Sequence, residues 1–465
     1  MNDKNISAQS VACADMPATT LPEEKRGLLG AFLLFMLPVL LDCVLQSLSG
    51  TISNIYIGHL LGAKDLAAAS TFYPLLLVLV SCGVGLGTGA SVLVGQKWGA
   101  GAFDQARTAV AAAISLSIVF GGAIAIFGQW GVIPMLWLFS VPTEIAGPAE
   151  AYCRIFLAGT PALVLLITVA ITLRGAGDNI RPLAMMGVQI LISIVATPVL
   201  IVSPLGVSGA AVTGIVGWIV SLVFVGCWLR VSQHPLAPCR AMMRELLPAP
   251  VVLRSVVRLG FPAMIEIATQ GLAEVILVGR INSFGPDMTA AYGLFTQTLT
   301  YIEFPGMAVG ITVSVLCSHA IGARQPGRAR AVLRVGFIVG LMVTGLLASI
   351  VSFEPAWVSG LFTSDPQVMI IANHAFRAVM WSAVLLSLGG ILGAAMRANG
   401  DTIPPMAIML GCILMIELPA GYLFAKTYGA WGVWLGYTAS FSSIFLASAL
   451  YWLLIWRHRP LTPIG

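Results

Sequence analysis

The feature that most restricts this chain is a succession of apolar stretches, each long enough to cross a lipid bilayer. A helix needs about 20 apolar residues to span the hydrocarbon core. Only 9% of the 465 residues are charged and 58% are hydrophobic, whereas a soluble protein carries about 25% charged residues. We therefore expect an all-α membrane protein with twelve transmembrane helices. The predicted spans are approximately 29–57, 67–96, 107–130, 149–173, 181–203, 208–230, 256–280, 289–319, 330–353, 371–396, 403–425 and 431–456.

The basic residues predict the orientation of these spans. Cytoplasmic loops carry an excess of Lys and Arg. With the N-terminus inside, 19 of the 24 basic residues fall at inner ends or in inner loops. Both termini are therefore predicted to be cytoplasmic, in a protein of the inner or plasma membrane. The polar segment 1–26 predicts a tail rather than a cleavable signal, whose apolar core would begin sooner.

The two halves of the chain repeat the same motifs. LRGAGDNIRP (173–182) resembles MRANGDTIPP (396–405), and WGAGAFDQAR (98–107) resembles IGARQPGRAR (321–330), with the same offset for both pairs. Six spans in each repeat give both copies the same orientation, with a pseudo-twofold axis along the membrane normal and substrate sites between the repeats. The predicted segments are a cytoplasmic N-terminal tail (1–27), an N-lobe (28–230), a cytoplasmic linker (231–255), a C-lobe (256–456) and a cytoplasmic C-terminal tail (457–465).

Acidic residues lie inside the first and seventh spans, where a carboxylate costs about 2.5–3.5 kcal/mol on insertion scales. A proline is followed by an acid four positions later and a glutamine four after that, once in each half: Pro38, Asp42 and Gln46, then Pro262, Glu266 and Gln270. Polar side chains can join helices by hydrogen bonds. Two acids at equivalent points across a central cleft repel each other, however. We therefore expect Asp42 and Glu266 to carry a proton or bind a cation.

Both motifs belong to polar stripes on one helix face. The stripes are Asp42, Gln46, Ser49 and Ser53 in the first span, about 16 Å long, and Glu266, Gln270 and Glu274 in the seventh. Such a stripe faces protein or water rather than lipid. We expect Gln46, Ser49, Ser53, Asn54 and Gln270 to line the substrate site, although helix–helix hydrogen bonding is the favoured interpretation for the serines. Glu274 is a candidate for proton coupling, and the alternative is that it forms an ion pair with Arg280.

Two further acids lie close to prolines inside spans. Glu303 precedes Pro305, and Glu417 precedes Pro419. A proline inside a helix kinks it and frees backbone groups. Glu303 is a candidate for proton coupling and Glu417 for substrate binding, and a structural role stays open for both.

Other patterns in the sequence do not point to an enzyme. The glycine-rich stretch CGVGLGTGAS (82–91) lies inside an apolar run, so we expect close helix packing or a hinge rather than a nucleotide loop. The sequence shows no P-loop and no catalytic constellation. Its eight cysteines form no CxxC pair and are typical of small hydrophobes. We expect no cofactor, metal or nucleic-acid partner, only a coupling ion.

Several motifs together resemble the multidrug and toxic compound extrusion (MATE) family over residues 30–455. They are SNIYIGHLLGAKDLAAAS (53–70), VLVGQKWGA (92–100), LRGAGDNIRPLAMM (173–186) and SPLGVSGAAV (203–212), with their second-half counterparts. The resemblance implies two six-helix lobes in a V around a central cleft, and a monomer. It also implies secondary antiport of organic cations against protons or sodium.

The chain departs from the family pattern at its ionisable positions. Ser53 stands where members often carry an acid, Gln270 where many carry a glutamate, and the tenth span has no acid. We therefore expect proton coupling, with Asp42 and Glu266 alternately protonated as the lobes rock. The alternatives are a sodium-coupled antiporter, a lipid-linked or glycan flippase, which the few inward basic residues disfavour, and a scaffold or receptor that transports nothing.

Overall fold

The computed structural model describes residues 27–70, 72–138, 143–238, 250–429 and 431–464, so the predicted N-terminal tail lies outside the described residues except for Gly27. Every regular element among them is a helix. The first half contains α2 (Leu28–Leu60), α3 (Ala63–Ser70), α4 (Tyr73–Gly99), α5 (Phe103–Leu138), α6 (Thr143–Ala158), α7 (Thr160–Gly175), α8 (Ile180–Val202) and α9 (Ser208–Val231). The second half contains α11 (Pro250–Asn282), α12 (Pro286–Gly322), α13 (Pro326–Phe353), α14 (Pro355–Gly360), α15 (Pro366–Ala398), α16 (Ile403–Cys412), η1 (Ile413–Glu417), α17 (Leu418–Tyr428), α18 (Trp431–Leu454) and η2 (Trp456–His458).

These helices account for all twelve predicted spans. Ten helices of the described chain are long and apolar enough to cross a membrane, and α6 with α7 forms one further span bent by 50°. The 33-residue helix α11 covers the remaining predicted span, although Glu266, Glu274 and its arginines leave it less apolar than the others. The predicted linker 231–255 lies partly outside the described residues, and its last part already belongs to α11.

Two spans are interrupted, and proline explains both breaks. Pro161 stands in the first turn of α7, directly after the bend at Gly159, where a proline fits because its missing N–H needs no partner. The other span contains the π-helix η1, which ends at Glu417 two positions before Pro419. Proline clashes with the carbonyl four positions earlier, and a π-type turn accommodates such a disturbance.

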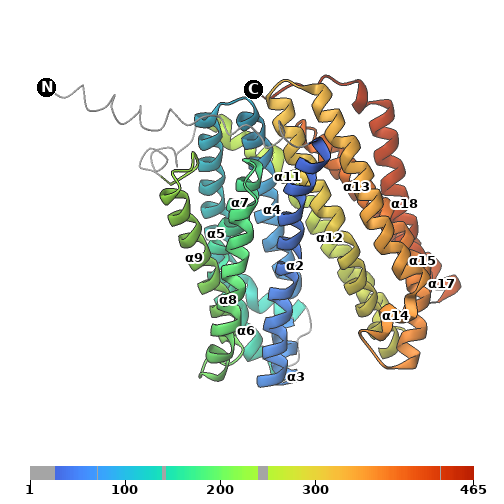
Figure 1. The fold of residues 1–465 in the computed structure, drawn as a ribbon. Coiled ribbons are helices and arrows are strands. Elements are labelled where there is room, and N and C mark those ends of the chain that lie inside the picture. Colours follow the sequence, from blue (N-terminus) through green and yellow to red (C-terminus); the bar gives the residue numbers. More distant parts are fainter. Residues whose placement is uncertain (1–26, 71, 139–142, 239–249, 430, 465) are drawn as a thin grey trace.

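The helices of each half gather into one lobe (Figure 1). The lobes lie close together at the end where α2 begins and the C-terminus lies, and they separate toward the opposite end. We call these the closed end and the far end. The first helix of each half packs on the other half: Phe32 and Met36 of α2 belong to a core cluster of α12, α13 and α15. Val256 and Leu259 of α11 belong to the N-lobe core.

The glycine-rich stretch 82–91 lies where α4 crosses α11. A Cβ atom on Gly85 would lie 2.9 Å from the carbonyl oxygen of Gly260, and a Cβ on Gly260 would lie 2.4 Å from that of Gly85. Only glycine permits this approach of two backbones. The prediction of close helix packing is confirmed.

Candidate functional site

A cavity of about 320 Å³ lies between the lobes, and we call it the inter-lobe cavity. Helices α4 and α7 of the N-lobe line one side, and α11, α12, α15 and α16 line the other. Its charged residues are Glu266, Glu303 and Arg397, and most other lining residues are apolar or small. The volume falls at the lower end of the range for small-molecule sites, about 300–1,000 Å³.

Glu266 forms an ion pair inside this cavity. Nη1 of Arg397, in the last turn of α15, lies 3.1 Å from Oε2 and 3.3 Å from Oε1 of Glu266. The two side chains of Arg397 and Glu266 are only 19% and 15% exposed. The seventh-span acid is therefore neutralised by an arginine of its own lobe.

Asp42 has the same arrangement in the N-lobe. Nη2 of Arg174, in the last turn of α7, is paired with Oδ2 of Asp42. The aspartate is 5% exposed and the arginine 11%, and neither lines the inter-lobe cavity. The two acids occupy equivalent positions in the repeats, and so do the two arginines. The ion pair itself is therefore duplicated.

The two arginine partners are the part of the site that sequence reasoning missed. The repeat aligns Arg174 with Arg397. The excess of basic residues at the cytoplasmic side accounts for both arginines at the inner ends of their spans, so the sequence did not suggest an acidic partner for either. A signal was present, because acids inside a membrane usually pair with an ionisable partner. The structure thus separates Asp42 and Glu266 into two neutral pairs.

Glu303 differs from both acids. It lines the inter-lobe cavity, and within the described ranges it forms no hydrogen bond or ion pair. Glu274 and Glu417 lie close enough to interact with it electrostatically. Glu417 is 6% exposed and accepts a hydrogen bond of 2.7 Å from Ser440. When Glu303 is ionised, one ion pair and one unpaired carboxylate give the cavity a formal charge of −1, which suits a cation.

Arg280 is not the partner of Glu274. Its guanidinium lies 5.1 Å from the ring centres of both Phe284 and Tyr422, where cation–π attraction holds it. Glu274 therefore stays a candidate for coupling, in the same neighbourhood as Glu303.

The polar stripe of α2 lies apart from the inter-lobe cavity. Oγ of Ser53 lies 3.3 Å from Oγ of Ser193 on α8, which is the helix–helix contact favoured for the serines. Gln46 and Asn54 are exposed and Ser49 is half-buried. Of the residues expected to bind substrate, Gln270 is the one that lines the cavity.

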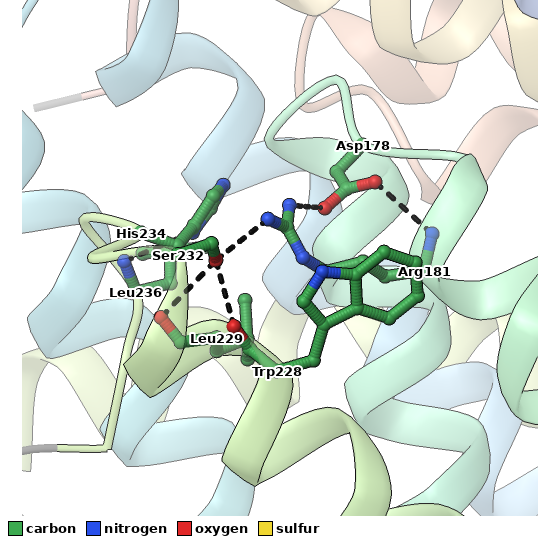
Figure 2. Close-up of polar contacts among 7 residues, drawn as sticks. All are labelled: Asp178, Arg181, Trp228, Leu229, Ser232, His234 and Leu236. Carbon is green, nitrogen blue, oxygen red and sulfur yellow. Dashed lines mark hydrogen bonds and ion pairs between the residues drawn. The ribbon is translucent and has the colours of Figure 1, made fainter.

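The GAGD motif anchors the chain that follows α9 (Figure 2). Asp178 pairs with Arg181, and Nη2 of Arg181 donates a 2.8 Å hydrogen bond to Oγ of Ser232. The guanidinium also lies 5.3 Å from the ring centre of Trp228. In the second repeat, Asp401 accepts a 3.0 Å hydrogen bond from Arg459, beyond α18. The aspartate of each motif thus helps to hold the chain after the last span of its lobe, through Arg181 in the first repeat and directly in the second.

His234 lies in the same anchor, outside the membrane-spanning segments. Its ring stacks on Trp98 at 5.8 Å between ring centres, and its Nδ1 accepts a hydrogen bond from the backbone N–H of Leu236. Burial, with the nearby charge of Arg181, lowers the pKa of His234 to about 4, while Asp178 acts in the opposite direction. The imidazole is therefore neutral near pH 7.

The family model MatE matches the chain twice, over residues 38–199 and 262–423. The chain belongs to the MATE family. It is a multi-pass membrane transporter and not an enzyme. The two matches begin at Pro38 and Pro262, the prolines of the repeated acid motif. One match falls within each of the repeats found in the sequence, and each ends before the last span of its half.

Individual relatives agree with this assignment over nearly the full chain. The probable multidrug resistance protein YoeA of Bacillus subtilis is 29% identical over 453 residues, 96% of this chain and 98% of its own length. The FAD transporter of Shewanella oneidensis is 24% identical over 441 residues, 93% and 96% of the two chains. The fold matches a mutant of the Vibrio cholerae MATE transporter VcmN with a TM-score of 0.86 and 21% identity, over 92% and 97% of the two chains.

Proposed function

We propose that this MATE protein is a secondary active exporter that exchanges organic cations or drugs for protons, and that the two compete for Glu303. The observation that carries the proposal is the contrast among the membrane acids. Glu303 faces the inter-lobe cavity without a cationic partner among the described residues, whereas Asp42 and Glu266 are each held by an arginine.

The ion pairs explain why protons would be exchanged at Glu303 first. Protonating Asp42 or Glu266 would leave a buried arginine uncompensated, which costs about 3–5 kcal/mol. Protonating Glu303 leaves no such charge behind and makes the cavity neutral, so that a bound cation loses its counter-charge. We keep Glu266 and Glu274 as further coupling groups, and Asp42 as the alternative to Glu303 that proton release on binding separates from it.

The shape of the molecule supports alternating exposure of the cavity. The lobes meet at the closed end and separate at the far end (Figure 1), so rocking them would expose the cavity to the other side. Multidrug relatives support an amphipathic organic substrate. We propose that the protein works as a monomer in the inner or plasma membrane, with both termini cytoplasmic.

Two observations support the flippase or anion-transport alternative. Arg397 places a basic group in the cavity, and one relative is named an FAD transporter, whose ligand is an anion. The pairing of Arg397 with Glu266 argues for the cation, because the arginine is already neutralised.

The test is transport of a fluorescent organic cation such as ethidium by the full chain in proteoliposomes, under an imposed pH gradient or an imposed sodium gradient. We expect uphill transport driven by the pH gradient, and its loss in Glu303→Gln. Ser314→Ala is the matched control, since Ser314 lines the same cavity without a charge. Full pH-driven transport by Glu303→Gln, or transport driven by sodium alone, would contradict the proposal.

A further inference from the structure

The backbones of the two lobes touch where α4 ends beside the end of α12, at the closed end. A Cβ on Gly99 would lie 2.1 Å from the carbonyl oxygen of His319, and a Cβ on Gly322 would lie 1.9 Å from that of Gln96. The two glycines occupy equivalent positions in the two repeats, and so do Gln96 and His319. The contact is therefore reciprocal, with the two repeats exchanging roles.

Two hydrogen bonds cross between the lobes at this contact. Nε2 of Gln96 donates to the carbonyl oxygen of Ala398 at 2.8 Å, and Nε2 of His319 lies 2.8 Å from the carbonyl oxygen of Gly175. Because a carbonyl only accepts, Nε2 of His319 carries the hydrogen. Both side chains are buried, at 1% and 4% exposure. The acceptors Gly175 and Ala398 are again equivalent in the two repeats.

The repeated motif explains why these two carbonyls are available. Helices α7 and α15 end at turns in which Gly177 has φ 90° and Gly400 has φ 87°, a conformation that favours glycine. The backbone N–H groups of residues 176–178 and 399–401 donate to carbonyl oxygens no later in the helix than Arg174 and Arg397. The last carbonyl of each helix, at Gly175 and Ala398, is left for another donor.

Each accepting carbonyl therefore directly follows an arginine of an ion pair. Arg174 holds Asp42 and Arg397 holds Glu266. Each ion pair is thus one residue away from a helix end whose carbonyl bonds the opposite lobe.

One half of the arrangement has an additional contact. The backbone N–H of Ile464 donates to Oε1 of Gln96 at 2.7 Å, and Nζ of Lys97 donates to the carbonyl oxygen of Ile464 at 3.2 Å. The Ile464 side chain packs against the N-lobe core and approaches Gly400. Gln96 thus joins α4, the end of α15 and the segment after α18.

We propose that Gln96 and His319 are positioning residues of a two-point latch, which keeps the lobes together at the closed end and must break before the cavity opens there. The latch rests on the alternating exposure put forward above. It assigns a role to the LRGAGD and MRANGD motifs, whose helix ends supply the two acceptors.

The test is a distance measurement between spin labels on the full chain, in detergent and in lipid. Labels at the exposed residues Gln105 and Arg330 report on the closed end, and labels at Leu205 and Asp287 report on the far end. The exposed Cys227 is replaced first, together with Cys13 and Cys239, which lie outside the described residues.

We expect Gln96→Ala and His319→Ala each to raise the ratio of long to short distances at the closed end by about two- to tenfold, the effect of one hydrogen bond. Gln96→Ala has the larger effect because it also releases Ile464. His319→Gln, which keeps a donor, stays close to the unmodified protein. Ser117→Ala is the matched control, because it removes a buried 2.9 Å hydrogen bond to Thr168 within one lobe.

The outcomes separate the latch from the proposed transport cycle. Unchanged closed-end distances in both alanine variants, or an equal change in Ser117→Ala, would overturn the latch. Longer closed-end distances with no matching decrease at the far end would uphold the latch and contradict the rocking of the lobes. Elution of each variant as a single folded species, checked by size-exclusion chromatography, excludes unfolding as the cause.

Discussion

The two lobes carry the same ion pair in different surroundings. Asp42 and Arg174 are packed inside the N-lobe, away from the cavity, whereas Glu266 and Arg397 lie in the cavity wall together with Glu303. The same ion pair thus occurs once in each lobe, but only the C-lobe pair lines the cavity. We infer that the N-lobe pair serves structure more than the C-lobe pair does.

The largest expected effect on stability comes from breaking the N-lobe pair. Arg174→Ala leaves the carboxylate of Asp42 buried without a partner, which should lower the free energy of unfolding by about 3–5 kcal/mol. Arg397→Ala should cost less, because Glu266 borders a cavity that water can enter. Thermal unfolding in detergent measures both, and Arg174→Gln with Asp42→Asn should recover part of the loss. Equal losses in the two lobes would contradict the difference drawn here.

Where the ends of α4 and α12 touch, equivalent substitutions in the two repeats should change stability equally, in contrast to the ion pairs. Gly99→Ala and Gly322→Ala each place a methyl group against a backbone carbonyl of the opposite lobe. Overpacking of this kind costs about 1–3 kcal/mol, so both variants should lower the unfolding midpoint to a similar degree. Gly122→Ala is the control, since nothing lies within 4 Å of its added Cβ. A lower unfolding midpoint in only one of these two variants would disprove the reciprocal contact.

The smallest effect concerns the anchor that follows α9. The pKa of His234 is about 4 in the folded protein, below its ordinary value of about 6.5. The unfolded chain therefore binds more protons between these values, and the free energy of unfolding falls as the pH is lowered through this window. His234→Gln should flatten the decline of the unfolding midpoint below pH about 6.5 and leave it unchanged above. An identical decline in the variant would show that His234 is not buried as described.

The fold could be predicted well from the sequence because hydropathy and repetition are both local signals. Twelve apolar stretches, together with motifs repeated at a nearly constant spacing, are enough for twelve spans in two lobes. A disturbed helix near Pro419 could be expected from the proline, but not its π-helical form. The bend at Gly159 was less accessible, because a bent and a continuous helix have the same hydropathy.

The site was only partly predictable, since pairing depends on three-dimensional contacts. Glu303 is identified by its position beside Pro305, but its lack of a partner among the described residues emerges only from the packing of α12 against its neighbours. Arg174 and Arg397 lie at the inner ends of their spans, where an excess of basic residues is expected in any case. Their position in the sequence therefore does not show that they pair with acids inside the membrane. The latch residue His319 carries no signal at all, as one histidine among five.

The most direct test of the central claim is proton release by the purified protein when an organic cation binds, in weakly buffered detergent solution at a series of pH values. We predict that the unmodified protein releases protons in proportion to bound cation, and that Asp42→Asn does the same while Glu303→Gln releases none. Proton release that persists in Glu303→Gln and disappears in Asp42→Asn would contradict the account, and would return the coupling role to the paired acid of the N-lobe.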